Sequence, residues 1–258
     1  MISELIQWVK LIDPLFFYWL SLLLYIVIQT IETISLGARV AGKACELPAL
    51  GVTLYQTFST LSRIFLPIFL ILLAFLVERG MYTYEFLTFA LIGSGVSFCI
   101  SVFVFVKIGT IYRYFFNVTV LLEKCTMPIA IILALVTRYE SEANRNTLEE
   151  YSNKSTKKKP VVVLTSLLSY FLLSSGIFIA FLFAIHYPEY RLTAVQFSAI
   201  FHGVGVILIS FYINPVYSQI MDLLPSDLLA YSNSVLIGRL FGLFLTFLLF
   251  LIIYFLNA

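Results

Sequence analysis

The segment STLSRIFLPIFLILLAFLV, residues 59–77, places Arg63 directly before an apolar run that reaches Val77 and is interrupted only by Pro67. The same arrangement returns in SVLIGRLFGLFLTFLLFLIIYFL, residues 234–256, with Arg239 in the matching place. A helix needs about 20 mainly apolar residues to cross a bilayer. Both segments therefore predict membrane-spanning helices that carry an arginine near one end.

The composition of the chain extends this prediction to the whole protein. Of its 258 residues, 61% are hydrophobic and 12% are charged, whereas soluble domains contain about 25% charged residues. We predict an all-α fold: a polytopic membrane helix bundle that forms a single membrane domain, 1–258. Its six predicted transmembrane spans are residues 15–34, 47–77, 84–106, 161–185, 193–213 and 228–256.

Basic residues in the loops predict the orientation. The connection 107–160 carries nine of the sixteen Lys and Arg residues, and such loops remain on the cytoplasmic side. With six spans, both termini then face outside. The N-terminal segment has an acidic residue early and a long apolar run, so we expect it to be a first span and not a cleaved signal.

The connection between the third and fourth spans has two parts. Its first part, 107–139, mixes aromatic, aliphatic and charged residues, which predicts amphipathic helices at the cytoplasmic interface. The second part, 140–159, is polar and includes Lys157, Lys158 and Lys159. We expect a flexible loop there, whose lysines either attract anionic membrane lipids or only set the topology.

Charged residues form a layer at the cytoplasmic ends of the spans. About 14 apolar residues follow Arg63 and about 17 follow Arg239, or roughly 21 and 25 Å of helix. Measured against a hydrocarbon core of about 30 Å, both arginines lie near its cytoplasmic boundary. Basic residues predominate in this layer, which predicts a binding site for a phosphate-bearing headgroup made of Arg39, Lys43, Arg63 and Arg239.

Two further features of this layer allow more than one interpretation. Glu32 lies at the same predicted depth, so Arg63 either pairs with Glu32 as part of the structure or remains available for an anion. The two arginine segments also align without gaps and run in the same predicted direction. This alignment predicts a parallel repeat that places Arg63 and Arg239 on facing helices.

Two signatures resemble those of a known family. The first is IETISLGARVAGKACELPALGVTLYQTFSTLSRIFLPI, residues 31–68. The second is QFSAIFHGVGVILISFYINPVYSQIMD, residues 196–222, followed by GRLFGLFL at 238–245. Both are similar to the Amj family of lipid II flippases, alternates to MurJ. The matching positions are Glu32, Thr33, Arg39, Ala41, Gly42, Ser62, Arg63, Pro67, Gly203, Pro215, Ser218, Asp222, Arg239 and Gly242. Asn214 departs from the pattern, since an aspartate is expected before the proline.

The resemblance implies a transporter, not an enzyme, that moves lipid II from the inner to the outer leaflet of the bacterial cytoplasmic membrane during peptidoglycan and cell-wall biogenesis. Its expected partners are undecaprenyl-pyrophosphate-linked lipid II and membrane lipids, without nucleic acid or cofactor. The pyrophosphate is expected on the basic residues above. Supporting or coupling roles are expected for Glu32, Asn214, Asp222 and His202.

Three other functions remain as alternatives. A flippase for another polyprenyl-phosphate glycan or for the carrier lipid would use the same phosphate chemistry. An ion or small-molecule transporter would use Glu32 as its site, although the basic excess disfavours this. An intramembrane protease would pair Ser94 with His202. The sequence contains neither a metal-binding pattern nor a phosphate-binding loop.

Overall fold

The computed structural model describes residues 14–122, 124–136, 160–223 and 225–257. Within these ranges all regular secondary structure is helical, and six helical segments are long and apolar enough to cross a membrane. The predicted all-α polytopic bundle is therefore confirmed. The predicted polar loop 140–159, with its three lysines, lies outside the described residues.

The six long segments follow in order along the chain. They are α2 (Pro14–Ala44), α3 (Pro48–Glu78), α4 (Thr83–Val106), α8 (Pro160–His186), α9 (Arg191–Leu208) and α11 (Leu228–Asn257). A π-helical turn, η2 (Ile209–Ile213), continues α9 into α10 (Asn214–Leu223), and short 3-10 turns lie at Pro188–Tyr190 and Pro225–Asp227. Two shorter helices, α5 (Ile108–Leu121) and α6 (Met127–Val136), occupy the connection between the third and fourth spans.

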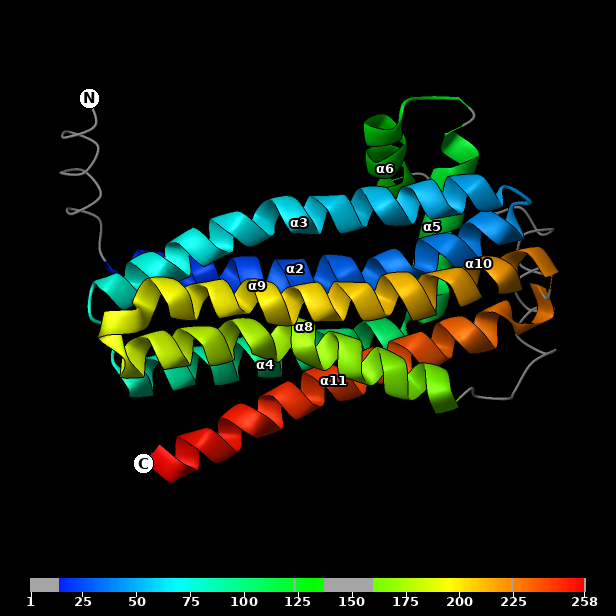
Figure 1. The fold of residues 1–258 in the computed structure, drawn as a ribbon. Helices are drawn as coiled ribbons and strands as arrows, with labels where there is room; N and C mark the ends of the chain where they lie inside the picture. The colour runs from blue at the N-terminus through cyan, green and yellow to red at the C-terminus, as the bar shows by residue number, and fades with distance from the viewer. Residues whose placement is uncertain (1–13, 123, 137–159, 224, 258) are drawn as a thin grey trace.

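The long helices lie side by side, and α5 and α6 lie at one end of the bundle (Figure 1). The start of α2 and the end of α11 are both at the opposite end (Figure 1). Helix α5 packs against α2 at Gly37, where an added Cβ would lie 2.9 Å from the side chain of Ile111. The end that carries α5 and α6 is called the α5 end below.

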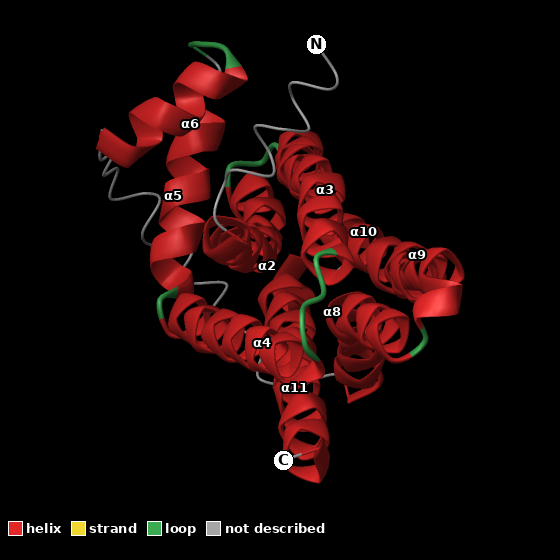
Figure 2. Cartoon of the chain, turned by 90° about the vertical axis from the view of Figure 1, so that its left-hand side faces the viewer, coloured by secondary structure: helices red, strands yellow, loops and turns green. Residues whose placement is uncertain are grey.

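The long helices form two units of three that run in opposite directions. In the first unit α2 packs along α3 and α4, and in the second α8 packs along α9 and α11. Each helix of one unit runs antiparallel to its counterpart in the other (Figure 1). The units meet mainly where α4 and α2 contact α11, while α3 and α9 lie at the outer edges (Figure 2). The two units therefore have the same order of helix contacts and opposite directions, as the halves of an inverted-topology repeat do.

Helix α2 is longer than the predicted span at its α5 end. The predicted span ended at residue 34, where polar and small residues begin, but α2 continues to Ala44. Residues 35–42 are all buried, because α3 and α5 cover this part of α2. Packing against other helices, and not hydropathy, therefore extends the helix. The position of a bilayer along the six helices stays a prediction.

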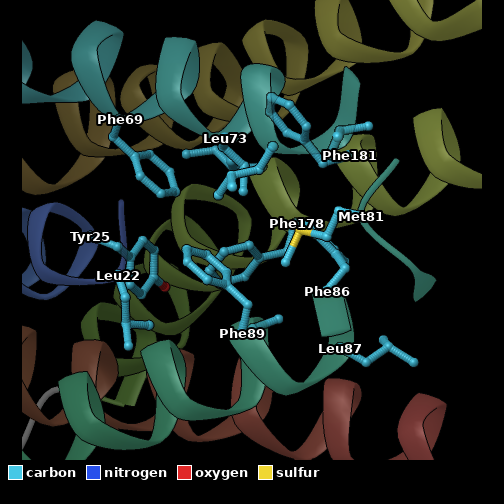
Figure 3. Packing of buried hydrophobic residues seen from close by; sticks show 14 of the residues in the cluster. Leu22, Tyr25, Phe69, Leu73, Met81, Phe86, Leu87, Phe89, Phe178 and Phe181 are labelled. Atoms are coloured by element: carbon cyan, nitrogen blue, oxygen red, sulfur yellow. The ribbon is translucent and has the colours of Figure 1, made fainter. Parts of the chain in front are cut away.

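An aromatic cluster fills the end of the bundle opposite α5. Phe69, Phe86, Phe89 and Phe178 are fully buried and pack with their rings 6.1–6.5 Å apart in four pairs. Figure 3 shows these rings meeting between α3, α4 and α8, with Tyr25 of α2 at the margin. Aromatic pairs at these distances are attractive beyond their buried area. The cluster therefore closes this end of the bundle.

Helices α2 and α3 make their closest approach next to the turn that joins them. A Cβ added to Gly42 would lie 2.4 Å from the Cα of Gly51. Backbone atoms of the facing helix cannot move aside as a flexible side chain can. This contact needs glycine at both positions, as do other close helix contacts in membrane proteins.

We expect Gly42→Ala to destabilise the protein by about 1–3 kcal/mol, because the added methyl group forces α3 away from α2. Gly203→Ala on α9 is the matched control, since nothing lies within 4 Å of its added Cβ. Thermal unfolding of the purified variants in one detergent measures both. Equal stability of the two variants would contradict the close approach of α2 and α3.

Candidate functional site

A cavity lies between the α2–α3 hairpin and the α8–α9 hairpin. Its volume is about 340 Å³, within the range of about 300–1,000 Å³ that is common for ligand pockets. Its walls come from α2, α3, α8, α9, η2 and the first residue of α10. The lining residues are Tyr25, Ile28, Gln29, Glu32, Ser35, Arg39, Tyr55, Gln56, Ser59, Thr60, Ser62, Arg63, Leu66, Tyr170, Leu173, Ile177, His202, Val206, Ile209, Ser210 and Asn214.

The cavity extends along the helix axis from the α5 end towards the aromatic cluster. Tyr25, Glu32 and Arg39 recur at intervals of seven residues on α2, so they share one face of the helix. At about 1.5 Å per residue, Tyr25 and Arg39 are about 21 Å apart. Arg39 lies at the α5 end of the cavity, Glu32 at its middle and Tyr25 at its closed end.

Arg239 lies behind the wall of the cavity, where it is fully buried. Its Nη1 donates to Glu32 Oε2 at 3.1 Å, and its Nε donates to Thr33 Oγ1 at 2.9 Å. Its Nη2 donates to both the carbonyl oxygen and Oε1 of Gln29, at 3.0 and 2.8 Å. The ring of Tyr170 lies 4.3 Å from the guanidinium. Helix α2 and the aromatic ring thus satisfy the charge of this α11 residue.

Arg39 is held in place but keeps an unused donor. Its guanidinium lies 3.7 Å from the ring centre of Tyr55 and 4.7 Å from that of Tyr217. Its Nη2 donates to Asn214 Oδ1 at 2.8 Å. Its Nε is buried without a hydrogen-bond partner, and no carboxylate of the described residues forms an ion pair with it. Arg39 is therefore fixed in position without being neutralised.

Arg63 lines the same cavity from α3 and is exposed. Its neighbour Ser62 donates to Glu32 Oε1 at 3.3 Å, but Glu32 forms its ion pair with Arg239. Among the described residues Arg63 has neither a salt bridge nor a hydrogen bond from its guanidinium. The alternative of a structural Glu32–Arg63 pair is thus not what the structure contains.

The residues predicted from sequence divide into two groups. Five of them line the cavity, namely Glu32, Arg39, Arg63, His202 and Asn214. Three do not: Arg239 lies behind Glu32, Lys43 lies in the last turn of α2, and Asp222 is exposed on α10. Helices α3 and α11 do run in the same direction (Figure 1), but α2 packs against both and they do not face each other. The parallel repeat therefore does not place the two arginines on facing helices.

A π-helical turn brings Asn214 to Arg39. Pro215 has no backbone N–H, so it cannot form the regular helical hydrogen bond at this point, and the turn Ile209–Ile213 takes an extra residue. The hydroxyl of Tyr231 donates to the carbonyl oxygen of Ile213 at 2.9 Å. Turns of this kind are frequent at functional sites.

Several lining residues were not predicted from the sequence. Gln56, Ser59 and Thr60 line the cavity together with Arg63. Their spacing of three, four and seven residues puts them on one face of α3. This spacing is visible in the sequence and could have indicated a polar face. The opposite wall, with Tyr170 and Ser210, had no comparable signal.

The geometry of Ser94 does not favour a protease. Ser94 is fully buried and donates to the carbonyl oxygen of Ala90 in its own helix at 2.6 Å. It is not among the residues that line the cavity, whereas His202 is. In the described ranges no group of three or more His, Cys, Asp or Glu side chains is arranged to hold a metal ion.

The fold and the cavity define a multi-pass helical membrane protein with two arginines on the wall of one internal cavity. The chain belongs to the Amj family, Alternate to MurJ, whose family model matches residues 24–252. No curated protein matches the chain, and no solved structure does. The match includes every residue that lines the cavity.

We expect Arg239→Gln to destabilise the protein strongly and Arg63→Gln to leave its stability almost unchanged. Loss of Arg239 leaves Glu32 and Gln29 without their partner, and breaking a buried pair in this way costs about 3–5 kcal/mol. Loss of Arg63 breaks no contact and should change the free energy of unfolding by less than about 0.5 kcal/mol. Unfolding of the two purified variants in the same detergent tests this difference, which would disappear if both arginines had the same structural role.

Proposed function

We propose that this protein is a flippase that moves lipid II from the inner to the outer leaflet of the bacterial cytoplasmic membrane. One observation carries the proposal. Among the charged residues that line the cavity, Glu32 is paired with Arg239, while Arg39 and Arg63 have no carboxylate partner. The described part of the cavity therefore has two uncompensated positive charges, which an anionic ligand would balance.

The chemistry of arginine supports a phosphate ligand. Charged side chains within membrane spans are rare and costly, so those without a partner are usually functional. The planar guanidinium forms paired hydrogen bonds with phosphate oxygens. Arg63 has all its donors unused, and Arg39 has an unused Nε. In this proposal Arg63 binds the pyrophosphate first and Arg39 attracts it into the cavity.

The packing of the helices supports entry from the side. Helix α3 is held by α2 and α9 is held by α8, but α3 and α9 scarcely contact each other. Gln56, Thr60 and Arg63 of α3 and Ser210 of η2 line the cavity and are exposed. The cavity is thus open along the edge between α3 and α9. A lipid could place its headgroup inside through this edge while its polyprenyl tail stays in the bilayer.

The distribution of basic residues supports the proposed orientation. Lys43, Lys107 and Arg113 lie near the α5 end, at the end of α2, the end of α4 and on α5. By the positive-inside rule this end is cytoplasmic, so both termini face outside. The cavity then lies in the half of the membrane where lipid II is made, and the aromatic cluster closes the outer half.

A flippase for another polyprenyl-phosphate glycan is the second candidate, because the unpaired arginines would bind its phosphate equally well. An ion transporter based on Glu32 is less well supported. Glu32 already forms an ion pair with Arg239, whose Nη1 donates to Oε2 at 3.1 Å. Such a carboxylate is poorly placed to attract a cation.

We expect expression of the wild-type protein to restore lipid II on the outer surface of bacteria depleted of their own lipid II flippases. Arg63→Gln should abolish most of this activity, because the phosphate loses its exposed partner. Arg113→Gln is the matched control, since Arg113 is an exposed arginine on α5 outside the cavity. The measurement is surface-exposed lipid II, normalised to the amount of each variant in the membrane.

Two results would count against the proposal. If wild-type protein at normal abundance exposes no lipid II, the substrate or the class of activity is different. If Arg63→Gln is as active as Arg113→Gln, the unpaired arginine does not bind the headgroup.

A further inference from the structure

A neutral polar surface lies between the levels of the two unpaired arginines. Helices α2 and α3 are antiparallel, so Tyr55 of α3 lies opposite Arg39, and Ser62 lies opposite Glu32. The interval from Tyr55 to Ser62 is seven residues, or about 10 Å of helix. Over this interval α3 contributes Gln56, Ser59 and Thr60 to the cavity wall.

The polar side chains of this surface have no hydrogen-bond partners among the described residues. None is formed by the side chains of Gln56, Ser59 and Thr60, or by Ser210 on the opposite wall. Thr53 and Thr57, which are on α3 but outside the cavity, instead donate to carbonyl oxygens of their own helix at 2.9 Å. Among the described contacts, the Ser59 and Thr60 hydroxyls are therefore available to a ligand, whereas Ser62, which also lines the cavity, donates to the carbonyl oxygen of Ser59 at 2.8 Å.

Buried groups with unmet hydrogen bonds lie at both ends of the cavity that contains this surface. Arg39 Nε at one end and the Tyr25 hydroxyl at the other line the cavity, are at least nine-tenths buried, and have no partner. An unsatisfied buried polar group costs about 1–3 kcal/mol, so native proteins rarely retain one without a reason. These groups indicate that the cavity accommodates a polar ligand.

The chemistry of the surface favours a carbohydrate over an ion or a second phosphate. Hydroxyl and amide groups both donate and accept hydrogen bonds, as the hydroxyl and acetamido groups of sugars do. A phosphate diester only accepts hydrogen bonds, and cation sites in proteins are usually built around carboxylate oxygens, which these four residues lack.

We propose that Gln56, Ser59 and Thr60 of α3, facing Ser210 of η2, form a subsite for the sugar next to the pyrophosphate of a lipid-linked glycan. This assignment rests on the proposed function, because it takes Arg63 as the phosphate-binding residue. It adds that the protein distinguishes a glycosylated lipid from the bare carrier through neutral hydrogen bonds along α3. The remainder of the headgroup extends out of the cavity through the edge between α3 and α9.

Binding of two lipids to the full-length protein in nanodiscs tests this subsite. The probes are undecaprenyl pyrophosphate, which has no sugar, and lipid II, which carries a sugar on the same pyrophosphate. Ser59→Ala/Thr60→Val removes two unused hydroxyls with little change in volume, and Thr53→Val/Thr57→Val is the matched control. We expect the first variant to bind lipid II about ten- to thirtyfold more weakly, as loss of two hydrogen bonds would cause. Its affinity for undecaprenyl pyrophosphate should remain within about twofold, a change of less than about 0.5 kcal/mol.

Two further variants, Arg63→Gln and Gln56→Met, separate the phosphate contact from the sugar contact. Arg63→Gln should weaken binding of both lipids, because it removes the phosphate contact that they share. Gln56→Met removes the amide of the same surface, and it tests the subsite if the double variant fails to fold. It should lower affinity for lipid II alone.

The outcomes separate the subsite from the proposed function. If wild-type protein binds neither lipid, the proposed function fails, and the subsite fails with it. Suppose that wild-type protein binds both lipids and that Arg63→Gln weakens the binding of both. If the Ser59/Thr60 and Gln56 variants then keep their affinity for both lipids, or lose the same affinity for each, only the sugar subsite is overturned. A loss of affinity for lipid II alone in the cavity-facing variants, but not in the Thr53/Thr57 control, supports the subsite.

Discussion

The buried guanidinium of Arg239 is the constraint on which the cavity depends. A fully buried charge inside the membrane needs protein partners, and Arg239 donates four hydrogen bonds to Gln29, Glu32 and Thr33 of α2. These contacts join the last helix of the chain to the first and fix the rotation of α2. They also use the single acidic side chain among the residues that line the cavity. The positive charge of the cavity is therefore a consequence of how α11 is attached to α2.

The same attachment divides the bundle into a fixed part and a less constrained part. Across the two units, α11 contacts α4 and α2, and α4 contacts α8. Helix α3 instead packs mainly against α2, and α9 mainly against α8. The cavity lies between these two outer helices, and so does its opening. An inverted relation between units allows the two halves of a transporter to exchange conformations. The edge between α3 and α9 is where such an exchange would alter access.

The number and type of helices could be predicted from the sequence because hydropathy and length determine them locally. The extent of α2 could not, since residues 35–42 look like a polar loop and become helical by burial against α3 and α5. The roles of the arginines could not be predicted either. Arg63 and Arg239 precede similar apolar runs, yet one is exposed and the other fully buried. The difference depends on Glu32, which is 207 residues from Arg239 in the chain. A contact over that distance cannot be predicted from the local sequence.

In the proposed function, passage of a headgroup to the other leaflet would have to separate the aromatic cluster, and α3 contains a point at which it could bend. Phe69 of α3 belongs to the cluster, and Arg63 of the same helix lies in the cavity. Pro67 lies between them and has no N–H, so the carbonyl of Arg63 lacks its regular helical partner and the helix can bend there. A bend at Pro67 would move Phe69 relative to Phe178 of α8 without breaking the Arg239 contacts, which involve α2, α8 and α11 but not α3. Arg63, the proposed headgroup-binding residue, and Phe69 of the aromatic cluster thus lie on one helix on either side of Pro67, which interrupts its hydrogen bonding.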